Sequence, residues 1–276
     1  MTSPIRYEFQ LEDYNPKLAY PHLYVTKAPF DGGKGDDTLV GDDKSNLLRG
    51  GAGDDILIGK EGSDVLDGGN GADLVEFSIP YAWGLPKPIG KGIYANISKG
   101  MAKDLYGSKD KLVSIEHVWG TYLGDEIIGN YKSNDIAGGD GDDKLLGLGG
   151  DDLLYGGPGK DFLVGGAGKD TFFYFLKDEG GDRIEGFQSG VDKFLVKGSS
   201  FILPDRPAGY SIGELNAGRF FIGSSASSDK QLFGYDAATK NVLYDSNGAT
   251  KGGVTVIATL TGSRSGLAAS DIEIVV

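Results

Sequence analysis

The chain of 276 residues contains no cysteine and only two histidines, His22 and His117. The absence of cysteine excludes a disulfide scaffold, a thiolate zinc site and a cysteine nucleophile. The two histidines stand far apart, and neither belongs to the His-Glu-x-x-His motif of zinc proteases. We also expect no nucleophile elbow of the Gly-x-Ser-x-Gly type. These shortages predict that the chain is not an enzyme.

Long apolar runs are missing as well, and none approaches the roughly 18–20 residues that cross a bilayer as a helix. We therefore expect no transmembrane segment. Residues 1–10 lack the basic segment and apolar run that mark a cleavable signal peptide. Basic residues number 27 against 40 acidic ones, a net charge of −13. Because a nucleic-acid binder must neutralise phosphates, this charge argues against a nucleic-acid partner.

The composition is nevertheless that of a folded protein. Hydrophobic residues make up 39% of the chain, with 14 Tyr and 13 Phe, so a core can form and disorder is a poor interpretation. The unusual excess is in glycine: 47 residues, more than twice the usual share of roughly 7%. The distribution of glycine along the chain is therefore the first feature to explain.

Much of the glycine belongs to a nine-residue unit that recurs without gaps in two blocks. The first block has five units from Gly32 to Glu76, and the second has six from Gly120 to Phe173. The offset of 88 residues between the two blocks is not a multiple of nine, so they are separate runs. The repeats also carry the acidity: the net charge is −8 over residues 31–76 and −6 over residues 120–175.

Three positions of the unit keep their chemical type in every copy, and the first of these is always glycine. The sixth position is always Asp or Asn: Asp37, Asn46, Asp55, Asp64, Asp73, Asp125, Asn134, Asp143, Asp152, Asp161 and Asp170. The eighth position is always apolar: Leu39, Leu48, Leu57, Leu66, Val75, Ile127, Ile136, Leu145, Leu154, Leu163 and Phe172.

Each unit is predicted to form a Gly/Asp turn followed by a three-residue strand whose middle residue points inward. Two units then make one coil of about eighteen residues, and stacked coils align their apolar residues in a column. This stacking places Asp37 beside Asp55, although like charges repel. A bound cation would relieve the repulsion. Carboxylate and carbonyl oxygens in a flexible cage favour calcium.

The unit reads Gly-Gly-x-Gly-x-Asp-x-apolar-x and resembles the calcium-binding nonapeptide of RTX (hemolysin-type) proteins. The resemblance implies an all-β fold, a parallel β-roll or β-helix of calcium-binding nonapeptide repeats in two blocks with a β-rich C-terminal cap. It also implies several calcium ions, about five to eight by the number of inter-turn gaps. In this family each ion takes oxygens from positions two, four and six of one unit and one, three and six of the unit after next.

Transferred to this chain, the pattern defines four regular sites. Their ligands would be Gly33, Gly35 and Asp37 with Gly50, Ala52 and Asp55; Gly51, Gly53 and Asp55 with Gly68, Asn70 and Asp73; Gly139, Gly141 and Asp143 with Gly156, Pro158 and Asp161; and Leu148, Gly150 and Asp152 with Gly165, Ala167 and Asp170. Units with Asn46 or Asn134 depart from the pattern, so weaker or empty sites are expected there. The remaining candidate ligands are Gly59, Glu61, Asp64, Asp125, Gly138, Asp140, Gly147 and Gly149.

The blocks divide the chain into five segments. We expect an N-terminal cap or lead-in, the first roll block, a β-helical connector of wider coils with a protruding loop, the second block, and a C-terminal β cap with a secretion-signal region: residues 1–30, 31–77, 78–119, 120–175 and 176–276. The last segment resembles the C-terminal flank of serralysin proteases. Its final residues, 271–276, resemble a type I secretion signal, and an edge strand of the cap is an equally consistent interpretation.

The resemblance implies a bacterial protein secreted to the cell exterior. An ABC exporter of the type I route would pass the unfolded chain, which would fold on calcium outside and act as a structural or binding module. The alternative is a polysaccharide-binding or accessory module like those of alginate epimerases, with contacts at Tyr81, Trp83, Tyr94 and Tyr122. An unrecognised enzyme is a third alternative, although a pair such as Asp104 and Glu116 has only residue type in its favour. His117 is predicted to be a partly buried histidine with satisfied hydrogen bonds.

Overall fold

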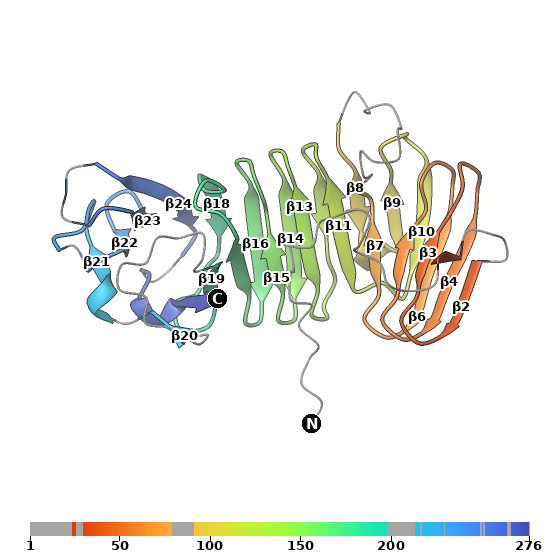
Figure 1. The fold of residues 1–276 in the computed structure, drawn as a ribbon, viewed down its shortest axis with the longest axis horizontal. Coiled ribbons are helices and arrows are strands. Elements are labelled where there is room, and N and C mark those ends of the chain that lie inside the picture. Colours follow the sequence, from red (N-terminus) through yellow and green to blue (C-terminus); the bar gives the residue numbers. More distant parts are fainter. Residues whose placement is uncertain are drawn as a thin grey trace.

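The computed structural model describes residues 24–25, 30–78, 91–197, 213–215, 217–228, 230–248, 250, 252–263 and 266–275. The coils lie side by side along the long axis, with the first block near one end and the C-terminal region at the other (Figure 1). Most of the expected N-terminal cap and loop residues 79–90, with His22, Tyr81 and Trp83, lie outside the described residues.

Two facing sheets form the roll, because successive strands along the chain alternate between them. Within the described residues the narrower sheet has 11 strands. In spatial order they are β1 (Tyr24–Val25), β3 (Thr38–Val40), β5 (Ile56–Ile58), β7 (Leu74–Glu76), β11 (His117–Thr121), β13 (Asp135–Gly139), β15 (Leu153–Tyr155), β17 (Thr171–Tyr174), β19 (Lys193–Lys197), β25 (Ile272–Val275) and β20 (Gly213–Glu214).

The wider sheet has 14 strands among the same residues. In spatial order they are β2 (Phe30–Lys34), β4 (Leu47–Ala52), β6 (Val65–Asn70), β10 (Lys109–Val113), β9 (Met101–Lys103), β8 (Tyr94–Asn96), β12 (Glu126–Ile128), β14 (Lys144–Gly149), β16 (Phe162–Ala167), β18 (Asp182–Glu185), β24 (Val254–Thr261), β23 (Asn241–Asp245), β22 (Phe233–Asp236) and β21 (Phe220–Ile222).

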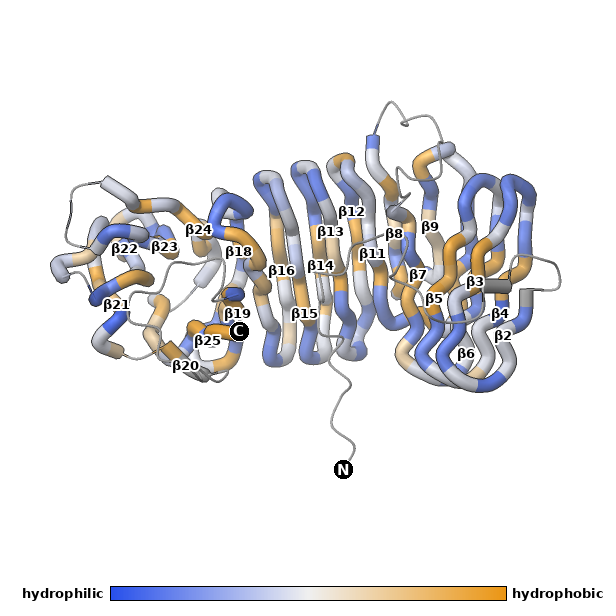
Figure 2. The backbone as a smooth tube through the Cα atoms, in the orientation of Figure 1, coloured by the Kyte–Doolittle hydropathy of each residue, from blue (hydrophilic) through white to orange (hydrophobic). Residues whose placement is uncertain are grey.

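The strand register confirms the eighteen-residue coil. Leu39 pairs with Leu57, and Leu57 pairs with Val75, all in parallel strands. All eleven apolar residues of the eighth position are at most 1% exposed and belong to one core. Figure 2 shows hydrophilic residues at the turns along the long edges of the roll and apolar residues within the strands. The parallel β-roll is therefore the fold of both blocks.

The connector joins the blocks differently in the two sheets. In the narrower sheet β7 pairs directly with β11, which pairs with β13, so that Val118 continues the core column between Val75 and Ile136. In the wider sheet, β10 pairs in parallel with β6, and the antiparallel strands β9 and β8 follow before β12. Instead of the expected wider coils, the described connector contains one regular coil, β10 with β11, and an inserted strand pair.

The C-terminal region continues both sheets and covers the end of the column. β18 pairs with β16 and β19 pairs with β17, both in parallel. Phe172, Phe187 and Phe194 form an aromatic cluster with centroids 5.2–6.1 Å apart. The segment after Asp271 forms β25 between β19 and β20, as an inner strand.

Helices contribute little to this fold. In the described part of the chain there are three 3-10 turns: η3 (Ile97–Lys99), η4 (Ala217–Arg219) and η5 (Ala269–Asp271). None of the helices that the structure describes is long and apolar enough to span a membrane.

The column of eighth-position residues should dominate the stability of the calcium-loaded protein. Leu48 is 0% exposed, whereas its neighbour Leu47 is 40% exposed. Replacing Leu48 by Ala removes buried methyl groups and leaves a cavity, so the free energy of unfolding should fall by about 2–5 kcal/mol. Denaturant unfolding in excess calcium measures this, and Leu47→Ala is the control. Equal losses in the two variants would contradict the column as the main core.

Candidate metal centre

The sixth-position side chains form a hydrogen-bonded ladder along each edge of the roll. The backbone N–H of Asp37 donates to Oδ1 of Asp55 at 2.8 Å, and that of Asp55 donates to Oδ1 of Asp73 at 2.9 Å. In the second block the N–H of Asp143 donates to Oδ1 of Asp161 at 2.9 Å. One carboxylate oxygen of Asp55, Asp73 and Asp161 is thus occupied by the preceding coil, and this fixes the side chain between two turns.

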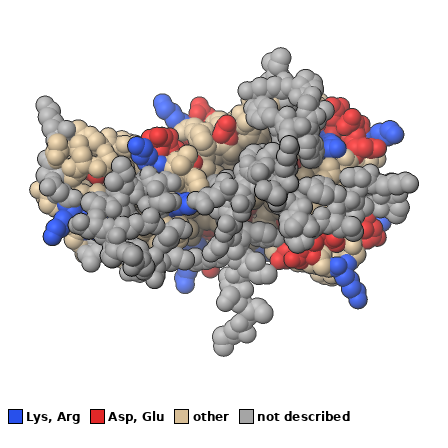
Figure 3. Space-filling model, viewed as in Figure 1, with Lys and Arg blue, Asp and Glu red and all other residues tan. Residues whose placement is uncertain are grey.

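The other oxygen, Oδ2, is buried without a hydrogen-bond partner in eight of the eleven units, all within the described residues. These are Asp37, Asp55, Asp64, Asp73, Asp143, Asp152, Asp161 and Asp170. Burying an unpaired ionised oxygen is strongly unfavourable unless a positive partner is present. The same oxygen arrangement at eight turns therefore fits a cation better than a defect of packing. Figure 3 shows acidic side chains gathered on the rims at the end that holds the first block.

The invariant glycine of each unit lies directly beneath this oxygen. A Cβ atom on Gly50 would collide with Oδ2 of Asp55 and would lie 2.6 Å from the carbonyl oxygen of Gly68. A Cβ atom on Gly138 would likewise collide with Oδ2 of Asp143. Only glycine therefore lets the carboxylate and the next coil's carbonyl approach the same point, which explains why the first position never varies.

The backbone at position two divides the turns into two kinds. In the eight units with an unpaired Oδ2, position two has a positive φ: Gly33, Gly51, Lys60, Gly69, Gly139, Leu148, Gly157 and Gly166. We call these open turns. Their position-two N–H can point away from the carboxylate, as at Gly139, which donates to the carbonyl of Gly156 at 3.0 Å. Oδ2 is then left for another ligand.

The other three turns, which we call closed, satisfy the sixth side chain themselves. The N–H groups of Asp42 and Asn130 donate to Oδ1 of Asn46 and Asn134, respectively, both at 2.8 Å. The N–H of Thr121 donates to Oδ2 of Asp125 at 2.6 Å. A position-two donor takes the place that a cation would occupy, so these turns need no metal.

The asparagine side chains complete their turns with the amide group. Asn46 Nδ2 donates to Asp42 Oδ1 at 2.9 Å, and Asn134 Nδ2 donates to the carbonyl of Glu116 at 2.9 Å. Asp125 differs from the expectation that it contributes to a site, because Thr121 occupies its oxygens with both an N–H and a hydroxyl. The signal in the sequence was Thr121, a β-branched residue at the position that has a positive φ in the eight open turns.

The register adds carboxylates that the repeat pattern missed. Asp110 Oδ1 accepts the N–H of Asp64 at 2.9 Å, and Asp182 Oδ1 accepts that of Asp161 at 2.9 Å. Beyond the second block, the hydroxyl of Tyr174 donates to Asp182 Oδ2 at 2.7 Å. The hydrogen-bonded ladder therefore extends past the nonapeptides to Asp182. There the hydroxyl of Tyr174 satisfies the oxygen that is unpaired in the open turns.

The electrostatics of the ladder follow from burial. Desolvation and neighbouring carboxylates raise the pKa of the sixth-position aspartates above their ordinary value near 4, to about 9 for Asp143, about 8 for Asp161, about 7 for Asp73 and Asp152, and about 6 for Asp55, Asp64 and Asp170. Without a cation, several of these groups hold a proton at neutral pH.

The donor set is one of backbone carbonyls and single carboxylates. Among the described residues no three Asp, Glu or His side chains converge as in a centre built from side chains alone. Carbonyl oxygens of the glycine-rich turns would therefore have to supply most ligands, and such all-oxygen cages suit calcium.

The histidine expectation is confirmed. His117 is 12% exposed at its side chain, and Nδ1 accepts the N–H of Asp135 at 3.0 Å. Burial lowers the pKa of His117, so the neutral ring is favoured. Of the aromatic residues considered for glycan contact, Tyr94 accepts a hydrogen bond from Asn96 Nδ2 at 3.2 Å, while Tyr81 and Trp83 lie outside the described residues.

The expectation of no Gly-x-Ser-x-Gly sequence is wrong, because residues 209–213 read Gly-Tyr-Ser-Ile-Gly. Ser211 itself lies outside the described residues. A nucleophile elbow requires a strand before the serine and a helix after it. Here Gly213, the last residue of the motif, begins the strand β20 (Gly213–Glu214), where an elbow would continue as a helix.

Proton binding gives a prediction for the metal-free chain. A carboxyl whose pKa is raised on folding is protonated in the folded state and ionised in the unfolded state between about pH 4 and its folded pKa. The free energy of unfolding should therefore fall as pH rises above 5, by about 1.4 kcal/mol per pH unit for each such group until the pH reaches its folded pKa, which lies between about 6 for Asp55 and about 9 for Asp143. Circular dichroism in EGTA should show more β structure at pH 5 than at pH 8. A loss of structure on acidification would contradict these pKa values.

Among the solved structures that resemble this chain are the following two. One is the AlgE6R3 subunit of the Azotobacter vinelandii mannuronan C5-epimerase, at 29% identity over 54% of this chain and 77% of that one, with a TM-score of 0.37. The other is the extracellular lipase LipA from Serratia marcescens, at 16% identity over 86% of this chain and 38% of that one, with a TM-score of 0.27. Comparison with curated proteins finds no match.

The family comparison matches the repeats directly. The RTX calcium-binding nonapeptide repeat is found in four copies, over residues 31–66, 49–77, 119–154 and 137–172. These copies cover the two blocks in which the buried unpaired oxygens occur. Over these two blocks the chain is similar to the RTX calcium-binding nonapeptide repeat.

Proposed function

We propose that the chain is a secreted module whose two blocks fold when calcium fills the gaps between open turns. The observation that carries this proposal is the set of eight buried, unpaired Oδ2 atoms, each in an open turn. Four gaps have an open turn on both sides. They lie between Asp37 and Asp55, Asp55 and Asp73, Asp143 and Asp161, and Asp152 and Asp170, and we propose these four as the principal sites.

The family pattern supplies the remaining ligands of each site from carbonyl oxygens. The gap between Asp37 and Asp55 would use the carbonyls of Gly33 and Gly35 on one side and of Gly50 and Ala52 on the other. Gly33 and Gly35 both have a positive φ, a conformation that glycine adopts at little cost. Gaps with one closed turn, such as that between Asn46 and Asp64, would bind more weakly.

Folding and binding would then be a single event. Extracellular modules bind calcium with Kd of about 0.1–1 mM, so at 1 mM calcium each site adds about 0.4–1.4 kcal/mol. Four sites contribute about 2–6 kcal/mol, which is comparable to the net stability of a whole domain. In a compartment poor in calcium the same carboxylates would repel one another and oppose folding.

This coupling suits export of an unfolded chain through a type I ABC exporter. The residues that we propose as the secretion signal, 271–276, include strand β25, in which Ile272 and Ile274 are buried. They are accessible only before the roll closes, so calcium-dependent folding would leave the signal readable inside the cell and bury it outside. Extracellular calcium would also favour forward transport, because it traps the folded form.

A calcium titration followed by circular dichroism tests the proposal, with Asp143→Asn as the diagnostic variant. The amide removes one cation ligand, so the calcium midpoint should rise at least roughly tenfold, the lower end of the loss seen when metal sites lose a supporting partner. The matched control is Asp142→Asn, one residue away. Asp142 is exposed, and its Oδ1 accepts the N–H of Lys160 at 2.9 Å, which an amide oxygen can also do. Unchanged β structure in EGTA would refute the proposal.

A further inference from the structure

The outer face of the wider sheet carries three exposed lysines in the connector. Lys109 and Lys111 lie on β10 and Lys103 lies on β9, and each adjoins a buried residue along its strand. Because side chains alternate between the two faces of a strand, the three lysines point away from the core. The register places Lys109 directly opposite Lys103 in antiparallel strands. We call these three residues the lysine patch.

The fold provides the lysine patch with no carboxylate partner. Within the described residues, none of its three members takes part in an ion pair. Three carboxylates of the same face have cations of their own: Glu126 with Lys144 at 2.7 Å, Glu185 with Arg183 at 3.6 Å, and Asp67, diagonal to Lys111, directly opposite Arg49. Like charges directly opposite each other destabilise a sheet, so the patch has a cost that the protein itself does not offset.

Protection of a sheet edge does not explain the patch. Lysines on an edge strand prevent pairing with another chain. Here β9 and β10 are inner strands, between β6 and β8. The chain as a whole has a net charge of −13, so a group of unpaired cations is the exception on its surface. The lysine patch is therefore a candidate surface for an anionic partner.

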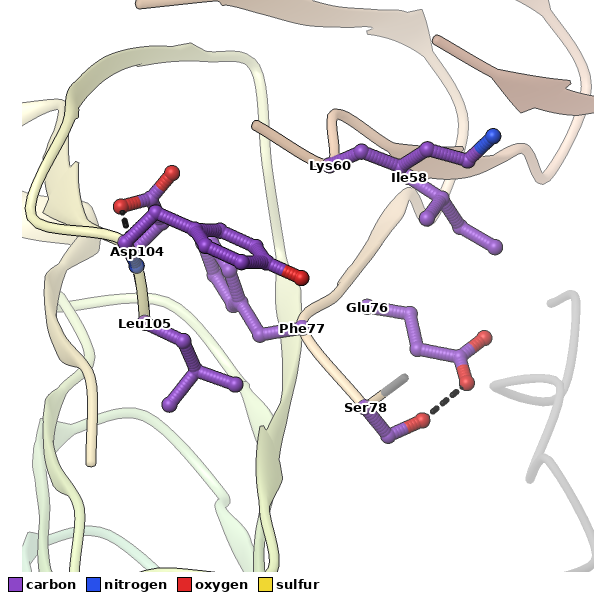
Figure 4. A pocket seen from close by; sticks show the side chains of 8 residues that line it. Ile58, Lys60, Glu76, Phe77, Ser78, Asp104 and Leu105 are labelled. Carbon is purple, nitrogen blue, oxygen red and sulfur yellow. Dashed lines mark hydrogen bonds between the residues drawn. The ribbon is translucent and has the colours of Figure 1, made fainter. Parts of the chain in front are cut away.

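The turn between β9 and β10 holds the two strands in place. Oδ1 of Asp104 accepts the N–H groups of Tyr106 at 3.0 Å and Ser108 at 2.7 Å, so the turn is closed by its own side chain. Leu105 and Phe77 pack against the core of the roll, and Figure 4 shows both beside the small pocket between this turn and the end of β7. The patch thus lies on strands with a fixed connection, which favours a defined binding geometry.

An aromatic ring adjoins the lysine patch. Tyr94 of β8 stands directly opposite Lys103 and is half-buried. Its hydroxyl accepts a hydrogen bond from Asn96 Nδ2 at 3.2 Å. A tyrosine combines an apolar ring with a polar tip, and a sugar ring likewise has an apolar face and polar edges. Cations beside this ring therefore fit a sugar that carries an acidic group.

The spacing of the patch distinguishes between classes of polyanion. Neighbouring strands lie about 4.8 Å apart, and alternate residues of one strand about 6.8 Å apart, so the lysine backbones are separated by about 5–7 Å. A polysaccharide with one carboxylate on each sugar ring repeats its charge at a similar interval. Three lysines are too few for nucleic acid, which requires many phosphate contacts, and for an anionic membrane, which is bound by clusters of about four to eight basic residues.

We propose that Lys103, Lys109 and Lys111, together with the ring of Tyr94, bind the carboxylates of an acidic polysaccharide that lies across β8, β9 and β10. This inference goes beyond the proposed calcium function and rests on it only because the roll must be folded. The polysaccharide would lie on the outer face of the wider sheet, whereas the proposed calcium sites lie in the turns at the edges of the roll.

Isothermal titration calorimetry of the full chain in excess calcium tests the proposal, with hexagalacturonate as the probe and maltohexaose as the uncharged hexasaccharide. The parent should bind hexagalacturonate and not maltohexaose. The patch variant, Lys103→Gln with Lys109→Gln and Lys111→Gln, should bind roughly tenfold more weakly, because three exposed ion pairs are lost together. The matched control replaces three exposed lysines elsewhere by Gln, with the same change in charge, and should bind like the parent: Lys160, Lys169 and Lys240.

Three further measurements separate binding from a structural role. Tyr94→Phe keeps the ring and should keep the affinity, whereas Tyr94→Ala should lower it. Added salt should weaken binding by the parent more than binding by the patch variant. Denaturant unfolding in calcium should show the patch variant at least as stable as the parent, because like charges have been removed.

Equal affinity in the parent and the patch variant, equal losses in the two triple variants, or equal binding of maltohexaose overturns the proposal. Cosedimentation with phosphatidylserine vesicles, without binding of hexagalacturonate, also overturns it and indicates a membrane partner. If the patch variant does not fold, Lys103→Gln alone is compared with Lys240→Gln in the same way.

Circular dichroism separates this proposal from the calcium function. A chain that folds in calcium and does not bind hexagalacturonate refutes the polysaccharide site alone. A chain that keeps its β structure in EGTA and binds hexagalacturonate through the lysine patch refutes the calcium function alone.

Discussion

The structure depends on one constraint: stacking the coils buries a carboxylate oxygen without a donor at eight of the eleven nonapeptide turns. The hydrophobic column requires an eighteen-residue register, and this register brings Asp55 between Asp37 and Asp73. One oxygen of each carboxylate is satisfied by the neighbouring coil, but the geometry leaves the other without a donor. Core packing and charge burial therefore oppose each other, and a cation is what makes them compatible.

The parts that could be predicted from the sequence are those set by local periodicity. The column and the two blocks follow from a repeat of nine residues, whereas the steric role of the first glycine became visible only in the structure. The kind of turn at position two was not predictable in the same way, because Lys60 and Leu148 adopt positive φ although they are not glycine, whereas Thr121 does not. The backbone conformation at position two depends on contacts with the neighbouring coils. The sequence of a single unit does not specify these contacts.

In the connector, too, the sequence pattern did not predict which strands pair, because the paired strands lie far apart along the chain. Residues 109–118 supply a regular coil with Leu112 and Val118 in the column, but the preceding turn lacks the glycine pattern that would have revealed it. The antiparallel strands β8 and β9 are inserted between this coil and β12, so partners in the wider sheet are not consecutive along the chain. Strand pairing of this kind depends on tertiary contacts, and the nine-residue periodicity of the sequence does not predict it.

The positions of the closed turns have a consequence for how the roll assembles. Two of the three, at Thr121 and Asn130, lie at the start of the second block, beside the connector coil. There Asn134 bonds to the carbonyl of Glu116, and His117 accepts the N–H of Asp135. Protein donors thus satisfy the sixth-position side chains of these two turns, while eight other sixth-position aspartates of the two blocks keep an unpaired oxygen. If calcium fills the open turns as proposed, these two closed turns would form without it, and the open turns beyond them would depend on it.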